Sequence, residues 1–309
     1  MRTAVVLAAG GYVGQAFHLG VLSALAEVAD LDPRRAGVLV GTSAGSLVAA
    51  GLAGGLSVAD LVADMLGESL SAAGTALRDG GRPHLAAPRA EVLPVARWGP
   101  LAPGILLAAG RRPWAVRPAA LLSSLLPPGR TSTDKLADDV RRVHGERWPD
   151  RDLRICAVRA RDGRRVVFGT PGAPDVDVGT AVAASCAIPA YFTPVRVAGE
   201  AYVDGGVHSP SNADVVLADR VELAIVSSPM SFGHGAGPLG TDRGVRFAIR
   251  RYLAAEVRRL RAGGARVLVV EPSPADLAVM GVKPMLGPRV AEVIDSAAAS
   301  TRAYLGSRL

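Results

Sequence analysis

Cysteine is almost absent from the 309 residues: Cys156 and Cys186 stand alone, without the paired spacing of a metal site. Two isolated cysteines cannot build a disulfide framework, so we expect two small buried side chains in a reducing cytoplasm. We expect no zinc, other metal or organic cofactor. Aromatic residues are also scarce, at 4%, whereas alanine and glycine are abundant. Helices and strands can therefore approach closely, with small side chains between them.

The sequence also lacks a membrane-spanning or secretory signal. After Arg2, the apolar run Ala4–Ala9 is too short for a signal peptide and ends at glycines. The uncharged stretch Gly37–Ala59 is 23 residues long, enough to cross a bilayer, but it contains six glycines. We interpret it as a buried strand followed by a helix, and we expect a cytoplasmic protein.

Lysine is nearly missing, so arginine carries almost all of the formal charge of +7. Residues 70–130 contain eight Arg against two acidic residues, and residues 242–266 again contain eight against two. Each segment has a local charge of +6, and the remaining residues sum to −5. Such patches favour anionic partners, either lipid head groups or nucleic acid. A solvated arginine surface without any partner is an equal alternative.

Apolar runs alternate with stretches of helical spacing, which predicts an α/β fold with a mostly parallel central sheet and helices on both faces, in three layers. Hydrophobic residues make up 49% of the chain, enough for a sizeable core. The expected strands are 3–8, 37–40, 153–158, 165–168, 221–226 and 267–270. The expected helices are 15–28, 44–52, 58–66, 133–143, 246–260 and 289–304.

We expect a single domain over residues 1–309, with its core at about 3–228 and a C-terminal extension of helix and strand at about 240–309. Nine of the 22 prolines fall between 70 and 130. A core of strands and helices would not be interrupted so often. This segment is therefore interpreted as a basic insertion over the core, acting as a lid, a cap or a loop.

The pentapeptide Gly41-Thr42-Ser43-Ala44-Gly45 lies between an expected strand and an expected helix. G-x-S-x-G in this setting is typical of a nucleophile elbow, in which the serine sits on a strained turn at a helix N-terminus. The same pattern also arises by chance in chains rich in glycine and serine. The strand–turn–helix context favours the nucleophile.

Residues 10–14 read Gly-Gly-Tyr-Val-Gly and follow the first strand directly. A dinucleotide-binding loop is one interpretation, but the first glycine of that fingerprint is Ala9 here, and no acidic residue closes a following strand. A plain tight turn is another. The interpretation that fits best is an oxyanion hole formed by the amides around Gly10, Gly11 and Tyr12, beside the serine on the neighbouring strand.

A third motif, Tyr202-Val203-Asp204-Gly205-Gly206, places a carboxylate at a strand end. An Asp-Gly pair alone usually marks a turn. Here it follows the segment 184–189, which reads Ala-Ser-Cys-Ala-Ile-Pro, and Phe192-Thr193-Pro194.

Taken in order, these motifs resemble those of the patatin-like phospholipases, from about Thr3 to Ser228 with 70–130 excluded because such families vary there. The resemblance implies a catalytic dyad without histidine, in which Ser43 is the nucleophile and Asp204 the base. It also implies that the amides of Gly10, Gly11 and Tyr12 bind the oxyanion. The accompanying motif glycines are Gly14, Gly41, Gly45, Gly205 and Gly206.

The chain departs from the family pattern at two positions. Ala9 replaces the first loop glycine, and Val13 stands where many relatives carry Arg or Lys. A missing cation near the oxyanion hole would weaken activity or shift substrate choice. The backbone amides remain, so the assignment stands.

Histidine offers a different base. The order Ser, Asp, His would suit an α/β-hydrolase triad with His208 or His234. His208 lies four residues after Asp204, in a loop rich in glycine and proline, and we interpret it as a rim residue rather than the base.

The sequence thus predicts a carboxylic ester hydrolase of the phospholipase A or lysophospholipase type. It would act on a lipid or acyl ester, with peripheral contact to anionic membranes as an option and no nucleic-acid partner. Two other classes stay open: a weak or inactive lipid-binding protein on the same fold, supported by Ala9 and Val13, and a nucleotide-dependent oxidoreductase, supported by the glycine loop.

Overall fold

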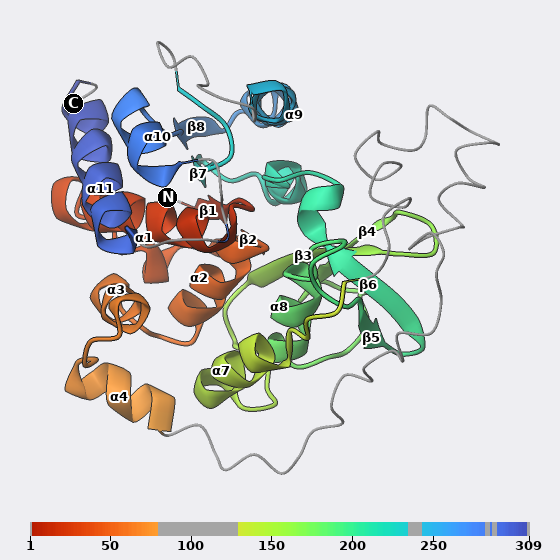
Figure 1. The fold of residues 1–309 in the computed structure, drawn as a ribbon. Coiled ribbons are helices and arrows are strands. Elements are labelled where there is room, and N and C mark those ends of the chain that lie inside the picture. Colours follow the sequence, from red (N-terminus) through yellow and green to blue (C-terminus); the bar gives the residue numbers. More distant parts are fainter. Residues whose placement is uncertain (1, 80–128, 234–242, 282–284, 286–288, 308–309) are drawn as a thin grey trace.

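A computed structural model of the chain describes residues 2–79, 129–233, 243–281, 285 and 289–307. Their strands form one eight-stranded sheet in the order β5-β6-β3-β2-β1-β7-β8, with β4 paired to β3 (Figure 1). The strands are β1 (Thr3–Leu7), β2 (Val38–Thr42), β3 (Leu153–Arg159), β4 (Arg165–Phe168), β5 (Val195–Val197), β6 (Glu200–Asp204), β7 (Leu223–Ser227) and β8 (Arg266–Val270).

Parallel pairing dominates the centre of the sheet. β3, β2, β1, β7 and β8 pair in parallel, whereas β4, β5 and β6 are antiparallel at one side. β2 is buried along its whole length, as expected for a parallel strand covered on both faces. The predicted α/β class with a mostly parallel sheet is confirmed.

Helices cover both faces of the sheet. They are α1 (Gly11–Val28), α2 (Ala44–Ala53), α3 (Val58–Leu66), α4 (Ala72–Asp79), α7 (Asp134–His144), α8 (Val178–Ser185), α9 (Arg243–Ala262), α10 (Pro274–Met280) and α11 (Val290–Gly306). Figure 1 shows α10 and α11 on one side of β8 and α9 on the other. This is the three-layer arrangement that the sequence predicts.

Strand side chains alternate between two apolar layers, as the period of two requires. In β1, Val5 and Leu7 join the layer built with α1, α2, α8 and α11. Ala4 and Val6 join the opposite layer, with α9 and the 3-10 segment Ala213–Asp219. Each central strand is therefore fixed in register from both sides.

Three helices were not expected from the sequence: α4, α8 and α10. The strand predicted to end at Asp204 is β6, which pairs with β5. α8 is apolar on every side because it lies buried, so it carries no amphipathic stripe. α1 begins at Gly11 rather than at residue 15, since the glycine loop already forms its first turn. In the segment 70–130, residues 72–79 form α4, and most of the predicted insertion lies outside the described residues.

No helix in the described part of the chain is both long and apolar enough to cross a membrane. The uncharged stretch Gly37–Ala59 forms β2, α2 and the start of α3 instead. A capping box begins α3, with Ser57 accepting from the Asp60 amide and Asp60 accepting from the Ser57 amide.

α8 is fixed at its start by a buried ion pair. Asp177 accepts the Thr180 amide at 2.9 Å as the N-cap of α8. The same carboxylate accepts from Arg141 of α7 through Nε at 2.9 Å and Nη2 at 3.1 Å. The guanidinium also contacts the exposed Asp138 at 3.1 Å. Asp177 therefore joins two helices and keeps a buried cation paired.

Removing this carboxylate should be costly. We expect Asp177→Ala to lower the free energy of unfolding by about 3 kcal/mol or more, because a buried guanidinium loses its main partner and α8 loses its cap. Asp138→Ala removes an exposed partner of the same arginine and should cost less than about 1 kcal/mol. Urea unfolding of both variants tests this, and equal losses would contradict it.

Candidate active site

The predicted site residues meet beside the carboxyl ends of β1 and β2. Leu7 of β1 lies opposite Gly41 of β2, so the glycine loop and Ser43 leave the sheet side by side. Asp204, at the end of β6, lies opposite Ala157 of β3, the strand next to β2. Three motifs that are far apart in the sequence therefore converge at one edge.

Ser43 occupies a strained turn between β2 and α2. Its φ of 53° and ψ of −124° lie in a region that non-glycine residues rarely adopt. A side chain on Gly45 would stand 2.0 Å from the Leu7 carbonyl oxygen, so the turn can press against β1 only with glycine there. The Ser43 amide donates to Ser185 Oγ at 2.9 Å, and Ser185 Oγ donates to the Cys156 carbonyl at 2.6 Å.

Asp204 is buried beside this turn. Its carboxylate accepts a hydrogen bond from the Ser43 hydroxyl and one from the Gly206 amide, the latter at 2.7 Å. Burial raises the pKa of Asp204 to about 6, against the opposing effect of the two hydrogen bonds. A carboxylate that is hard to solvate and already bonded to the serine is suited to accept the serine proton.

The glycine loop supplies backbone donors without partners. The Gly14 amide makes the first bond of α1, to the Gly10 carbonyl at 3.0 Å. Within the described residues, the amides of Gly11, Tyr12 and Val13 have no acceptor, as expected at a helix N-terminus. Together with the helix dipole, they form a ready site for a developing oxyanion.

The remaining motif glycines lie at close contacts. A side chain on Gly41 would meet Ser46 Cα at 2.5 Å, and one on Gly205 would meet the Cys156 carbonyl at 2.2 Å. A side chain on Gly14 would meet Pro229 at 3.1 Å. The motif glycines thus allow the turns to pack against one another.

His18 fixes the start of the glycine loop through hydrogen bonds. It is buried in α1, with Nε2 2.7 Å from the Ala8 carbonyl and Nδ1 2.7 Å from Ser227 Oγ. Because a carbonyl only accepts, Nε2 carries the proton and Nδ1 accepts from the serine hydroxyl. Burial lowers the pKa of His18 to about 4, so the ring is neutral and joins the ends of β1 and β7.

A buried carboxylate of α9 fixes a second turn beside the site. Glu256 accepts from Ser209 Oγ and Ser211 Oγ, each at 2.6 Å, and from the Ala213 amide at 2.9 Å. The pKa of Glu256 is raised, chiefly by burial. This side chain holds the turn that follows the Asp-Gly-Gly motif.

Asn212, within that turn, connects it to the catalytic edge. Its φ is 48°, a left-handed conformation that asparagine tolerates. Nδ2 donates to Thr42 Oγ1 at 3.1 Å and to the Gly205 carbonyl at 3.3 Å. Asn212 therefore bonds the residues next to Ser43 and Asp204. His18, Asn212, Glu256 and the role of Ser185 were not predicted from the sequence.

His208 follows the motif as expected, in the loop after the Asp-Gly-Gly turn. The hydrogen bonds that act on Asp204 come from Ser43 and Gly206. His234 lies outside the described residues. In the part of the chain that is described, no group of three His, Cys, Asp or Glu side chains could hold a metal ion.

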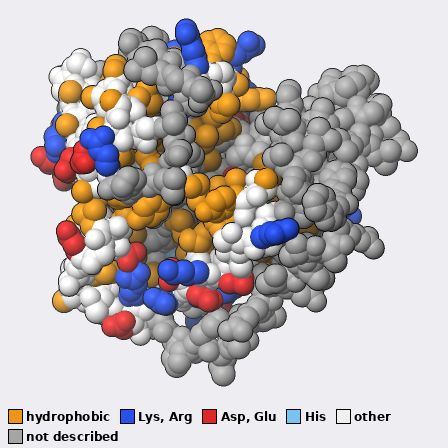
Figure 2. Space-filling model, viewed as in Figure 1, with side chains coloured by type: hydrophobic (Ala, Val, Ile, Leu, Met, Phe, Trp, Pro, Cys, Tyr) orange, Lys and Arg blue, Asp and Glu red, His pale blue; other side chains and the backbone are white. Residues whose placement is uncertain are grey.

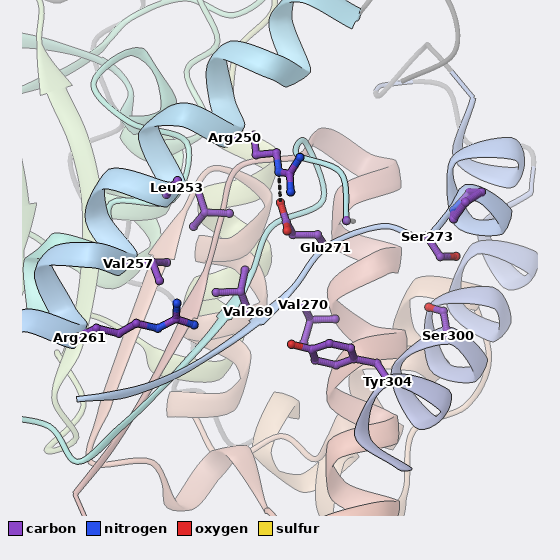
Figure 3. A pocket seen from close by; sticks show the side chains of 13 residues that line it. Arg250, Leu253, Val257, Arg261, Val269, Val270, Glu271, Ser273, Ser300 and Tyr304 are labelled. Atoms are coloured by element: carbon purple, nitrogen blue, oxygen red, sulfur yellow. Dashed lines mark ion pairs between the residues drawn. The ribbon is translucent and has the colours of Figure 1, made fainter. Parts of the chain in front are cut away.

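A cavity of about 460 Å³ lies away from this edge, along β8 between α9 and α11 (Figure 3). Arg250 Nε and Glu271 Oε1 face each other there at 3.9 Å. None of the predicted site residues lines this cavity. The cavity is therefore separate from the candidate active site.

The sequence matches the family profile of patatin-like phospholipase over residues 5–217, which is 213 of the 309 residues. The chain belongs to the patatin-like phospholipase family. Membership supports a lipid acyl hydrolase, in agreement with the arrangement of the three motifs. No curated protein matches the sequence.

Two solved structures resemble this patatin-like chain. VipD from Legionella pneumophila is 15% identical, with a TM-score of 0.47, and the match covers 99% of this chain and 67% of VipD. The type III effector protein ExoU is 18% identical, with a TM-score of 0.39, and the match covers 99% of this chain and 53% of ExoU. The chain thus spans about half the length of ExoU. The family assignment rests on the sequence match.

The two departures from the patatin-like pattern have different settings. Val13 is uncharged and is buried in the main apolar core, so the loop has no cation at this position. Ala9 lies beside the Asp-Gly-Gly turn: a side chain on Gly206 would stand 3.3 Å from the Ala9 methyl. Ala9 and Gly206 therefore lie in close contact across the two motifs.

The raised pKa of Asp204 predicts a pH-dependent cost in stability. An unfolded aspartate has a pKa of about 3.9, so between about pH 4 and 6 the folded protein holds a proton that the unfolded chain has released. Asp204 therefore favours folding most at low pH, and that contribution is lost as the pH rises through 6.

Asp204→Asn should remove this loss. Relative to the unsubstituted protein, we expect its unfolding free energy to rise near pH 8, by up to about 3 kcal/mol, and to change little near pH 4.5. Thermal unfolding across this range measures the difference. A variant that is destabilised equally at both pH values would show that Asp204 is a structural carboxylate.

Proposed function

We propose that this protein cleaves fatty-acyl esters of phospholipids or lysophospholipids through an acyl-enzyme, with Ser43 as nucleophile and Asp204 as base. The observation that carries the proposal is the hydrogen bond between the strained Ser43 and the buried Asp204. The donors of the glycine loop, on the neighbouring strand end, add to it.

The first half of the reaction acylates the serine. Asp204 takes the proton of the Ser43 hydroxyl as Oγ attacks the ester carbonyl carbon. The carbonyl oxygen becomes an oxyanion, held by the amides around Gly10, Gly11 and Tyr12. The intermediate collapses, the carbon–oxygen bond to the alcohol breaks, and Asp204 returns its proton to the leaving alkoxide.

The second half releases the fatty acid. Asp204 takes a proton from water as the water oxygen attacks the acyl carbon, and the oxyanion forms again in the same place. Its collapse breaks the bond to Oγ, and the proton passes back to Ser43. One residue thus serves as base and acid in turn, without a histidine.

This mechanism agrees with the environment of Asp204. At neutral pH a carboxyl with a pKa of about 6 is mostly ionised, yet basic enough to accept a proton. An exposed aspartate, with a pKa near ~3.9, would be a much weaker base. Burial therefore raises the pKa of Asp204 to a value that suits a general base, which is the role of histidine in a triad.

Covalent labelling tests the nucleophile. A fluorophosphonate should modify the native protein once, at Ser43, because only a serine that faces a base and an oxyanion site reacts readily. Ser43→Ala should abolish labelling and lower kcat/KM for an acyl ester by about three orders of magnitude or more. Mass spectrometry locates the adduct, and a label on another serine would exclude Ser43.

Substitution of the candidate bases tests the dyad. Asp204→Asn keeps the shape of the side chain but cannot accept the proton, so nearly all activity should be lost. His208→Ala should retain most activity, because the hydrogen bonds that act on Asp204 come from Ser43 and Gly206. If His208→Ala is folded and as inactive as Ser43→Ala, a triad replaces the dyad.

The pH profile alone does not separate the two bases. The raised pKa of Asp204 predicts that activity falls as the pH drops below about 6. A histidine base with an ordinary pKa of about 6.5 would give nearly the same fall in activity. The two variants therefore decide which group titrates: the fall in activity should persist unchanged in His208→Ala.

A further inference from the structure

Large apolar side chains are exposed around the catalytic edge. Figure 2 shows hydrophobic side chains gathered near the middle of one face of the molecule. Separately, four large apolar side chains of three segments are exposed: Tyr12 at 41% exposure, Tyr191 at 48%, Val245 at 57% and Phe247 at 55%. Exposed apolar side chains mark a contact surface where they lie together, so their places relative to the site matter.

The first of these side chains stands at the glycine loop. Tyr12 lies in the first turn of α1, next to the amides that face the oxyanion position. Pro229 packs against the same loop, since a side chain on Gly10 would meet its Cγ at 2.5 Å. The segment that follows β7 therefore borders the site.

α9 starts against that same segment. Arg246 Nη1 donates to the carbonyls of Pro229 and Ser231, each at 3.1 Å. Val245 and Phe247 flank Arg246 in sequence and are both exposed. The first turn of α9 therefore carries two exposed apolar side chains next to an arginine that bonds the segment bordering the glycine loop.

Tyr191 approaches from the side of Asp204. The Asp204 amide donates to the Ala187 carbonyl at 2.9 Å, and the Tyr191 amide donates to the Ile188 carbonyl at 3.1 Å. Tyr191 therefore lies four residues after Ala187, whose carbonyl is bonded to Asp204. Its ring packs edge-on against Phe192, with centroids 4.7 Å apart.

Two arginines accompany these side chains. Arg130 lies next to Gly129, whose backbone packs directly on that of Tyr191, and Arg243 begins α9 two residues before Val245. Both are exposed, and neither makes a hydrogen bond or ion pair within the described residues. A surface of aromatic and apolar side chains with unpaired guanidinium groups matches the chemistry of an anionic lipid interface.

Contacts along α9 fix the helix against the rest of the protein, so its first turn has a fixed position. Arg250 lies over the Phe232 ring, 4.9 Å from its centroid. Further along the helix, the buried Glu256 carries the three hydrogen bonds described above. An exposed side chain on such a helix is presented without a large ordering cost.

We propose that Tyr12, Tyr191, Val245 and Phe247, with Arg130 and Arg243, form a rim that binds an anionic phospholipid bilayer and turns the catalytic edge toward it. This inference rests on the proposed function for the choice of a lipid partner. Apolar side chains enter the head-group region, and the guanidinium groups bind lipid phosphates. The substrate ester then reaches Ser43 without leaving the interface.

Binding is tested in a Ser43→Ala background, so that the lipids stay intact. Vesicles of phosphatidylcholine with phosphatidylglycerol are sedimented with the protein and compared with phosphatidylcholine alone. We expect Val245→Ser with Phe247→Ser to weaken binding roughly tenfold or more. Arg130→Gln with Arg243→Gln should remove the preference for the anionic vesicles.

Matched controls come from exposed apolar residues elsewhere. Val28 ends α1 and Leu66 ends α3, both away from the glycine loop. Val28→Ser with Leu66→Ser should bind vesicles like the parent protein. Equal weakening by both pairs, no weakening by the rim pair, or tighter binding to duplex DNA than to anionic vesicles would overturn the rim.

A second measurement does not depend on tolerance of the serine variants. The native cysteines are buried, so Phe247→Cys and Leu66→Cys can each be labelled with a polarity-sensitive dye. On anionic vesicles the dye at 247 should shift to the blue and the dye at 66 should not. No shift at 247 would overturn the proposal.

The two proposals fail in different ways. With Ser43 intact, the ratio of phospholipid hydrolysis on vesicles to hydrolysis of a soluble short-chain ester should fall in the Val245/Phe247 variant. If vesicle binding follows the rim but no ester is cleaved, the proposed hydrolase fails and the rim stands. If soluble esters are cleaved while binding ignores the rim, the rim fails and the hydrolase stands.

Discussion

The turn at Ser43 is the constraint on which the catalytic edge depends. The φ and ψ angles of Ser43 lie in a region that is unfavourable for a non-glycine residue. Contacts on both sides of the turn hold Ser43 in this conformation. Gly45 presses against β1, and the Ser43 amide is bonded to Ser185, which is bonded in turn to β3. Three strands and two helices therefore meet at one residue. The ion pair that fixes α8 matters to the site for this reason, although it lies at the other end of that helix.

Electrostatics at the site follow from what surrounds Asp204. Burial makes its charged form unfavourable, and two hydrogen bonds compensate only in part. The adjacent turn is held by Glu256, a second buried carboxylate, whose three donors satisfy most of its acceptor sites. The two carboxylates differ in their donors: Glu256 is fixed by two hydroxyls and one amide, whereas Asp204 accepts one hydroxyl and one amide.

The sequence predicted the parts of this molecule that depend on local patterns. Strand–turn–helix spacing located Ser43, and the order of the motifs located Asp204 and the glycine loop. It did not predict the residues whose partners are distant in the chain, such as Asn212, which bonds a residue 170 positions away, or Glu256, whose serine partners are 45 and 47 positions away. A buried histidine such as His18 also leaves no local signal, and α8 was missed because a helix buried on all sides has no amphipathic period.

The contact between positions 9 and 206 links two motifs that lie 197 residues apart in the chain. A methyl group added at position 206 would stand 3.3 Å from the Ala9 methyl and 3.0 Å from the Asp204 carboxylate. Alanine at both positions therefore requires the turn after Asp204 to shift by a few tenths of an ångström. Because that turn carries the Gly206 amide that bonds Asp204, a change at residue 9 or 206 acts on the position of this carboxylate.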